Sequence, residues 1–346
     1  MQVVLAIDNH FPGYGGPFTA LSQTAKHLYL NGVDFKLIYE RNEFVKYNLD
    51  YKQIFQDAKI VHIFGIWTPW FIKTYKIAKK LKKKVIVSPL GATEPWSLDQ
   101  KKIKKKIAWH LYQKNYLDCA DYIHATSVDE KSHLLELGVK APIIVLPHGI
   151  EVIREKKKIQ IQTPRKAIFF SRIHEKKGLL ELVNSWKNLN NRDWILQIYG
   201  PVSDSIYLNK VKKLIKYQNL NSEIKIFDPV YDIKSKENIL NNSDCFILPS
   251  KSENFGLSIG EALSYGLPTL TTTATPWSLI NKYNAGIVFD FSQDNLTYSL
   301  KKFLSSSDDE FKAMSINAKK LILENYDFSK IIKGYIDFYN LMAENK

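Results

Sequence analysis

Cysteine is scarce in this sequence, which has only two in 346 residues, Cys119 and Cys245. Both lie among apolar residues, and neither has a partner at the spacing of a metal or redox site, so we expect buried thiols in a reducing compartment. Long apolar runs are also absent, since none approaches the roughly 20 residues of a membrane helix. The first residues, MQVVLAIDNHFPG, have no basic region ahead of a short apolar run, which predicts a first β-strand and not a signal peptide.

Several binding motifs are missing as well. The sequence has no D-x-D, no H-E-x-x-H and no cluster of cysteine and histidine, so we predict no metal site and no cofactor. It also has no G-x-G-x-x-G after its first strand, where GYGG stands at residues 13–16, and a dinucleotide-binding fold is therefore not supported. On the residues alone, GYGG is either a tight connecting turn or a loop close to a ligand.

The net charge is +14, and lysines gather in KKLKKK, from Lys79 to Lys84, and in KKIKKK, from Lys101 to Lys106. Such an excess attracts anionic partners. A nucleic-acid-binding protein would interleave aromatic residues in a recognisable module, and we find none, so we expect no nucleic acid partner. A polybasic helix face against anionic lipid head groups fits better, and solvated helix faces are the alternative.

Short β-rich segments alternate with helical ones along the chain. Six of these segments precede a polar, lysine-rich stretch without periodicity at residues 154–166, which we interpret as a linker, and six follow it. The predicted strands are residues 2–8, 34–40, 59–65, 85–90, 122–127, 143–149, 167–173, 194–200, 224–230, 244–250, 268–273 and 286–290. This repetition predicts an α/β protein of two doubly wound, Rossmann-like domains, residues 1–153 and 167–326, with a cleft between them.

The most informative stretch, residues 249–277, is a strand, a polar loop and a helix. Gly256 would let the backbone approach a ligand, and the first N–H groups of the helix would offer an anion site. Glu253 and Glu261 lie eight residues apart, about 80° apart on one helix, so they converge only if Glu253 is in the loop. Glu261 could then accept hydrogen bonds from a diol such as a ribose, while Glu253 reaches the group beyond the phosphates. The alternative is two solvated charges on a surface helix.

A second stretch, FFSRIHEKKG at residues 169–178, carries two cations between a strand and a helix. Arg172 offers a planar fork and Lys177 a point charge, and together they would neutralise a diphosphate leaving group. Surface charges in a helix-entry loop are the alternative.

The two stretches together resemble the GT4 family of retaining glycosyltransferases. ENFGLSIGEALSYGLP is similar to the family signature E-G-F-G-L-x-x-x-E-A-x-x-x-G-x-P, with Asn254 in place of the usual Gly, and Arg172 and Lys177 match the family's R-x4-K-G spacing. Gly15 and Gly16 match a glycine pair that lies beside the donor's phosphates and sugar in that family. The resemblance implies a GT-B fold whose last segment, residues 327–346, is a helix that packs back on the first domain.

A run in the first domain, SPLGATEPWSL at residues 88–98, resembles the S-P-H-G-M-L-x-P-W-A-L run of family members that build bacterial surface polysaccharides. Leu90 stands where those members often have a histidine that contacts the donor sugar, and His124 is a candidate substitute, with a core histidine as the alternative. Candidates for contact with the acceptor, which are otherwise core residues, are Glu94, Trp96, Trp67 and Trp70. The sequence TPW at residues 275–277 resembles the same subgroup.

The resemblance implies transfer with retention from a nucleotide-diphosphate sugar, UDP in preference to GDP. Arg172, Lys177 and the backbone N–H groups of Phe255, Gly256 and Leu257 would stabilise the departing diphosphate. Glu253 would orient the donor sugar and Glu261 the ribose, and we find no residue with a strong claim to be a general base.

We therefore expect a cytoplasmic glycosyltransferase, peripheral on the inner face of the cytoplasmic membrane. It would act on a lipid-linked or polysaccharide acceptor in the synthesis of bacterial surface glycans. One alternative is a non-catalytic basic scaffold or nucleic-acid-binding protein on the same frame. The other is a GT-B enzyme of storage-sugar metabolism, with glycogen or sucrose as the setting.

Overall fold

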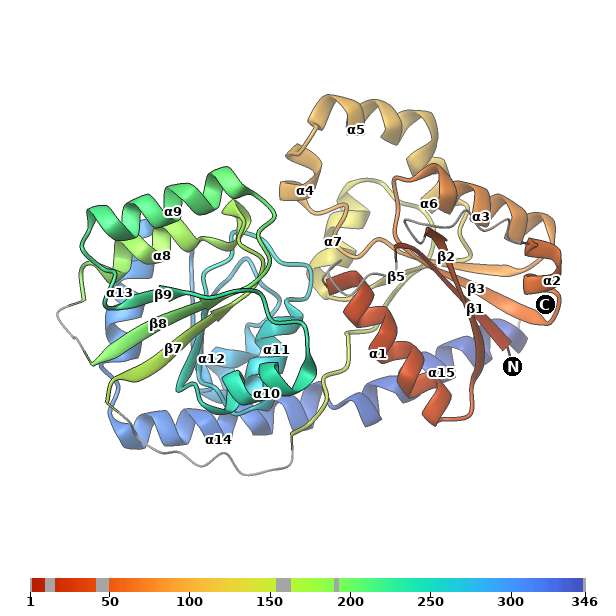
Figure 1. Cartoon of the computed structure of the whole chain (residues 1–346). Helices are drawn as coiled ribbons and strands as arrows, with labels where there is room; N and C mark the ends of the chain where they lie inside the picture. The colour runs from red at the N-terminus through yellow and green to blue at the C-terminus, as the bar shows by residue number, and fades with distance from the viewer. Residues whose placement is uncertain (1, 10–15, 42–49, 154–162, 190–192, 345–346) are drawn as a thin grey trace. The chain divides into compact units, whose positions relative to one another are not determined.

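A computed structural model of the chain (Figure 1) describes residues 2–9, 16–41, 50–153, 163–189 and 193–344. The chain divides into two compact units, of which the first comprises Met1–Gly149 and Phe328–Lys346 and the second Ile150–Asp327. Most of the stretch predicted as a linker, residues 154–162, lies outside the described residues. Among the helices that are described, none combines the length and the apolar character needed to cross a bilayer.

The first unit is built on a parallel sheet of six strands in the order β2-β1-β3-β4-β5-β6. The strands are β1 (Gln2–Asn9), β2 (Asp34–Arg41), β3 (Ala58–Phe64), β4 (Lys84–Ser88), β5 (Tyr122–Ala125) and β6 (Ile143–Val145). Side chains of β1 alternate between two cores, with Val4 and Ala6 on one face and Val3, Leu5 and Ile7 on the other. Because both faces are covered, the strand is apolar almost throughout.

Helices cover both faces of this sheet. They are α1 (Gly16–Leu30), α2 (Tyr51–Phe55), α3 (Pro69–Lys80), α4 (Pro95–Asp99), α5 (Lys102–Ala108), the π-helix η2 (Trp109–Gln113), α6 (Lys114–Asp118), α7 (Val128–Glu136) and α15 (Phe328–Glu344). The carboxy-terminal helix α15 packs against α1 and β3. Its buried stripe, at the helical spacing that an amphipathic helix requires, is Phe328, Ile332, Tyr335, Tyr339 and Met342.

The second unit has a parallel sheet of six strands in the order β12-β11-β10-β7-β8-β9. The strands are β7 (Arg165–Phe170), β8 (Trp194–Tyr199), β9 (Ile224–Ile226), β10 (Cys245–Leu248), β11 (Thr269–Thr272) and β12 (Gly286–Phe289). The helical elements are η3 (Glu175–Lys177, a 3-10 turn), α8 (Leu179–Trp186), α9 (Ser205–Tyr217), α10 (Ile233–Asn241), α11 (Leu257–Ser264), α12 (Leu279–Tyr283), α13 (Gln293–Leu304) and α14 (Asp308–Asn325). The two sheets confirm the predicted fold class and all of the predicted strands.

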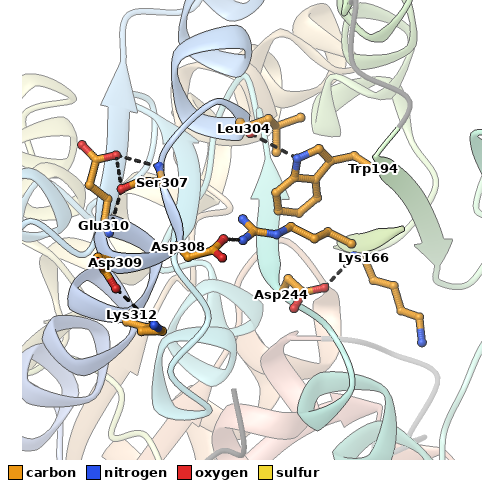
Figure 2. Close-up of polar contacts among 10 residues, drawn as sticks. Lys166, Trp194, Asp244, Leu304, Ser307, Asp308, Asp309, Glu310 and Lys312 are labelled. Atoms are coloured by element: carbon orange, nitrogen blue, oxygen red, sulfur yellow. Dashed lines mark hydrogen bonds and ion pairs between the residues drawn. The ribbon is translucent and has the colours of Figure 1, made fainter. Parts of the chain in front are cut away.

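Polar contacts anchor the amino ends of β7 and β8 (Figure 2). The Arg165 guanidinium forms an ion pair with Asp308 at the start of α14 and lies 5.4 Å from the centre of the Trp194 ring. The backbone N–H of Lys166 donates to the Asp244 carboxylate at 2.7 Å. These contacts hold the strands in register at their amino ends. Strand β7 starts at Arg165, two residues before the predicted start of the second domain.

The prediction of two buried thiols is wrong for one of them. Cys245 is buried in β10, but Cys119 is exposed. Cys119 is the residue that ends α6, and its thiol donates back to the Asn115 side chain at 3.4 Å. Its apolar neighbours Leu117 and Ala120 are buried in the core. Apolar neighbours in the sequence therefore did not predict whether the Cys119 side chain itself is buried.

Candidate functional site

The residues with the strongest sequence signals follow the two central strands of the second sheet. From β7 the chain proceeds outward to β8 and β9, and from β10 it proceeds in the opposite direction to β11 and β12. Open α/β sheets bind ligands outside the carboxyl ends of the strands at such a reversal of strand order. The loop after β7 carries Arg172 and Lys177, and the loop after β10 carries Glu253.

Lys177 and Glu253 form a buried ion pair. Their side chains are 11% and 9% exposed, and the Lys177 Nζ contacts Glu253 Oε1, which also accepts a hydrogen bond from the Ser250 hydroxyl at 2.7 Å. Burial by itself raises the pKa of Glu253, but the charges of Lys177 and Lys176 and these hydrogen bonds outweigh it, so the pKa is lowered. The Glu253 carboxylate is therefore held charged away from bulk water, and it depends on Lys177 as its partner.

Gly178 lets the two loops approach each other. Its φ is +68°, and a Cβ at this position would lie 2.1 Å from the carbonyl oxygen of Pro249, just after β10. The preceding 3-10 turn is capped by the His174 ring, which accepts the Lys176 N–H at 3.1 Å, and the Lys251 N–H donates to the Lys176 carbonyl at 2.8 Å. The glycine of the R-x4-K-G pattern is thus the residue that brings the Lys177 loop against the Glu253 loop.

Gly178→Ala is expected to destabilise the second unit and to weaken its ligand binding. A left-handed backbone with a side chain costs about 1–2 kcal/mol, and the contact with Pro249 forces the loops apart as well. Urea denaturation would measure the loss. Gly32→Ala is the matched control, because Gly32 has a φ of +74° with nothing within 4 Å of a Cβ. Equal losses in the two variants would show that the Pro249 contact contributes nothing.

The start of α11 is held by an aromatic anchor. Gly256 adopts a φ of +76° directly before the helix, the Trp277 indole N–H donates to the Phe255 carbonyl at 2.5 Å, and the two rings pack at 5.3 Å. The Glu253 N–H donates to the Ala274 carbonyl at 2.9 Å. The amino end of a helix favours an anion, and this anchoring fixes where that end of α11 lies. As predicted, Glu253 lies in the loop and Glu261 within α11.

Glu261 faces a lysine that the sequence did not point to. Its carboxylate contacts Lys236 Nζ of α10 at 2.5 Å, and this ammonium also lies 5.5 Å from the centre of the Phe170 ring. Phe170 begins a row of stacked aromatic rings at the carboxyl ends of three strands, with ring centres 5.9 Å apart between Phe170 and Tyr199 and 4.7 Å apart between Tyr199 and Phe227. Flat rings beside a carboxylate suit a base and a ribose.

The other predicted donor-site residues are Arg172, Gly15 and Gly16. Arg172 is exposed and makes no hydrogen bond or ion pair with any residue that the structure describes, so its guanidinium is available to a ligand. Gly16 begins α1 and has nothing within 4 Å of a Cβ position. Gly15 lies outside the described residues.

The predicted acceptor residues of the first unit lie near the loop after β4. Glu94 is buried and contacts His133 Nδ1 at 2.7 Å, while Trp96 is partly exposed. The buried Glu130 carboxylate accepts the N–H groups of Gly91 at 2.7 Å and Thr126 at 2.8 Å, which fixes the loop after β4 against the loop after β5. Of the two further tryptophans, Trp70 is in the core and Trp67 is partly exposed.

His124, the candidate substitute for the histidine that contacts the donor sugar, is buried as a core histidine in the structure. His124 is fully buried, and its two ring nitrogens contact the Ser88 hydroxyl at 2.7 Å and the Leu146 carbonyl at 2.8 Å. Ser88 also contacts His62 at 2.7 Å, and His62 contacts the Tyr339 hydroxyl of α15 at 2.7 Å. With both histidines neutral, each group from Tyr339 to Leu146 donates to the next, because the Leu146 carbonyl can only accept.

Acid is expected to destabilise the first unit through these histidines. Burial lowers the pKa of His124 to about 4 and that of His62 well below its usual value, from about 6.5 in an unfolded chain. The unfolded state therefore binds more protons in this window, so stability is complete above pH 6.5 and is lost as the pH falls towards 4. His124 alone accounts for on the order of 3 kcal/mol.

Urea denaturation at pH 7 and pH 4.5 would measure this loss. His62→Gln/His124→Gln should reduce the pH dependence, and the remainder belongs to His148, whose pKa burial lowers to about 3. Replacement of the exposed His110 should leave the pH dependence unchanged. A wild-type protein whose free energy of unfolding is constant over this range would contradict the neutral chain.

No group of three or more His, Cys, Asp or Glu side chains in the described part of the chain could hold a metal ion. Metal independence nevertheless stays a prediction. Positive charge near the switch point of the second sheet includes that of Lys177, Lys176 and Arg172.

Two doubly wound units, each built on a parallel sheet of six strands, are the architecture of the GT-B class of glycosyltransferase folds. The model of the Glycosyl transferases group 1 family matches residues 151–321 of the chain. This region covers nearly all of the second unit and includes both loops of the site.

Curated relatives are distant. The chain is 26% identical over 191 residues to a glycogen synthase of Petrotoga mobilis, an alignment that covers 51% of this chain and 38% of that protein. It is 22% identical over 221 residues to a GDP-mannose:cellobiosyl-diphosphopolyprenol alpha-mannosyltransferase of Xanthomonas oryzae, covering 62% and 57%. A 41.2 kDa protein of the cps region of Klebsiella pneumoniae is 23% identical over 251 residues, covering 68% and 66%. The chain thus spans well under two thirds of the first two relatives.

Solved structures share the fold over nearly the whole chain. A glycosyltransferase from Rickettsia africae is 19% identical, with a TM-score of 0.76 and coverage of 100% of this chain and 99% of that one. Anabaena Alr3699/HepE in complex with UDP-glucose is 13% identical, with a TM-score of 0.76 and coverage of 98% and 99%. WaaG, a glycosyltransferase involved in lipopolysaccharide biosynthesis, is 14% identical, with a TM-score of 0.71 and coverage of 97% and 99%. They confirm the GT-B fold.

Proposed function

We propose that the protein is a retaining glycosyltransferase that moves a sugar from a nucleotide-diphosphate donor to a lipid-linked or polysaccharide acceptor of bacterial surface glycans. The observation that carries the proposal is the buried Lys177–Glu253 ion pair beside the amino end of α11. A cation, a carboxylate and the amino end of a helix are the groups that a sugar diphosphate requires.

The anion site would act on the leaving group. Lys177, the exposed Arg172 and the first N–H groups of α11 would bind the diphosphate, whose negative charge grows as its bond to the sugar breaks. The acceptor hydroxyl forms the new bond to the anomeric carbon on the face from which the diphosphate leaves. Its proton passes to the departing phosphate oxygen, so that no protein base is required.

Glu253 would have two tasks at this site. Its carboxylate holds Lys177 in place, and with a donor bound its oxygens would also accept hydrogen bonds from hydroxyls of the donor sugar. A carboxylate kept charged by its neighbours is a strong acceptor for such hydroxyls. The sugar would thereby be oriented over the same cation that binds its leaving group.

Glu261 and the aromatic row would bind the nucleoside. We assign the ribose hydroxyls to the Glu261 carboxylate, with Lys236 as its partner, and the base to the exposed end of the row at Phe227, which is 39% exposed. Stacking accepts any base. We propose UDP in preference to GDP, and the complex of Anabaena HepE with UDP-glucose supports this choice.

The setting of surface glycans is supported by the names of relatives. The Xanthomonas relative is a mannosyltransferase that acts on a diphosphopolyprenol, and the Klebsiella relative is from a cps region. The match to a glycogen synthase favours storage-sugar metabolism as the second candidate. Transfer to a lipid-linked oligosaccharide and not to glycogen would decide between them.

Thermal stabilisation by UDP, GDP and ADP, each with Mg²⁺ and with a chelator, tests the proposal. A ligand at 100 times its Kd adds about 2.7 kcal/mol of stability. We expect UDP to stabilise the protein equally with and without metal. Stabilisation by none of the nucleotides would favour a non-catalytic scaffold, and stabilisation only with Mg²⁺ would contradict metal independence.

We also propose a cytoplasmic location at the inner face of the cytoplasmic membrane, where a lipid-linked acceptor is present. The lysines of the first unit support it, because an anionic leaflet attracts a polybasic surface.

A further inference from the structure

A helical arm in the first unit, residues 102–113, exposes a stripe of large apolar side chains. The arm consists of α5 and η2, which form one uninterrupted helix at the margin of the unit (Figure 1). Ile103, Ile107 and Leu111 are 76%, 55% and 75% exposed. In an α-helix, residues four apart are offset by about 40° around the axis. The wider π-helical turn shifts the next residue back in the other direction. The three side chains, which are four residues apart, therefore share one face.

Contacts on the opposite side fix the orientation of this face. Lys105, about 200° around the helix from Ile103, donates to the Ser97 carbonyl at 2.6 Å and lies 5.4 Å from the centre of the Trp67 ring. Trp109, one turn further along, is 9% exposed and packs near Trp67 at 6.3 Å. Because Lys105 and Trp109 hold the arm to the unit, Ile103 and its two partners point outward.

Lysines flank the apolar stripe on both sides. Lys104 and Lys106 are exposed, about 100° and −60° around the helix from Ile103. The remaining exposed lysine of the arm, Lys102, contacts Asp99 at 2.9 Å. An apolar face bordered by lysines is the arrangement of helices that lie in the interface of an anionic bilayer.

The other lysine-rich run lacks these features. Lys79 contacts Asp121 at 2.9 Å, and Lys83 donates to the Gln56 carbonyl at 3.1 Å. None of residues 79–84, all of which are described, exposes a large apolar side chain. This run also lies at the amino end of β4, whereas the arm follows its carboxyl end.

We propose that the arm docks the protein on an anionic bilayer, with Ile103, Ile107 and Leu111 among the acyl chains and Lys104 and Lys106 against the head groups. The docking site is this arm and not the run from Lys79 to Lys84. The inference extends the proposed location at a membrane and rests on it, but it does not depend on sugar transfer. It places the membrane beside the loop that carries Glu94 and Trp96.

Co-sedimentation with vesicles tests the proposal. We expect the wild type to bind vesicles of phosphatidylcholine and phosphatidylglycerol and not vesicles of phosphatidylcholine alone. Ile103→Asn/Ile107→Asn/Leu111→Asn should reduce binding at least about tenfold, and Lys104→Gln/Lys106→Gln should reduce it in a salt-dependent way. The matched controls, Val128→Asn/Leu135→Asn on α7 and Lys80→Gln/Lys82→Gln, change equally exposed side chains and should bind as the wild type does.

Two readouts separate the possible failures. If UDP stabilises every variant as much as the wild type, the variants fold. If UDP stabilises none of the proteins but the arm substitutions still reduce vesicle binding, the proposed donor is contradicted and the docking proposal stands. Full vesicle binding by the triple variant would overturn the inference. So would a wild type that ignores vesicles but forms a dimer that the triple variant loses, because the stripe would then face a second copy.

Discussion

Lys177→Met is expected to reduce sugar transfer about 10²- to 10³-fold, the loss observed when one preorganised donor to a developing negative charge is removed. It is also expected to destabilise the second unit by about 3–5 kcal/mol, because the buried Glu253 carboxylate is left without its cation. Urea denaturation and an assay of transfer would measure the two effects. Lys212→Ala, which removes an exposed lysine of α9, controls for net charge.

The double variant Lys177→Met/Glu253→Gln separates stability from catalysis. With both charges removed, the unpaired carboxylate is gone, and most of the stability should return. Transfer should stay as low as in Lys177→Met, because the diphosphate still lacks its cation. Restoration of activity together with stability would show that the ion pair serves only the fold.

Glu261→Ala is expected to weaken the affinity for the nucleotide about 10- to 100-fold. A hydrogen bond to a charged group contributes about 1.5–3 kcal/mol, and the proposal gives the Glu261 carboxylate to the ribose hydroxyls. Calorimetric titration with UDP and with 2′-deoxy-UDP would measure the effect. The loss caused by the substitution should be smaller for the deoxy nucleotide, because one of the hydrogen bonds is then already missing.

Lys236→Met provides the comparison for Glu261. Lys236 contacts the same carboxylate at 2.5 Å, so its removal frees both carboxylate oxygens without removing the acceptor. We expect a much smaller change in affinity than for Glu261→Ala. Equal losses in the two variants, with no dependence on the 2′-hydroxyl, would assign the pair to the structure and not to the ribose.

The sequence predicted the fold well because its signals are local. Buried strands of a parallel sheet are apolar throughout, and the helices between them are long enough to be seen by period. The positions of Arg172, Lys177 and Glu253 could also be predicted from the sequence, because each residue lies in the loop after its strand and parallel strands end at one edge of a sheet.

Contacts between distant segments were beyond the sequence. Lys236 precedes Glu261 by 25 residues on another helix, and no pattern joins the two. Trp277 drew attention only through a family resemblance, although its indole fixes the start of α11. His124 was a candidate because Leu90 replaces a family histidine, but its partners in the structure are Ser88 of β4 and Tyr335 of α15. Whether the Cys119 side chain is buried or exposed depends on the residue at which α6 ends, which the sequence pattern did not show.

Amide hydrogen exchange with and without UDP tests most directly whether the switch point of the second sheet is the donor site. We expect protection of peptides that cover residues 172–178 and 253–261, because bound phosphates would hold the backbone N–H groups there. The protection should disappear in Lys177→Met. Protection confined to other parts of the chain, or binding of UDP with no protection of these two loops, would contradict the proposed site.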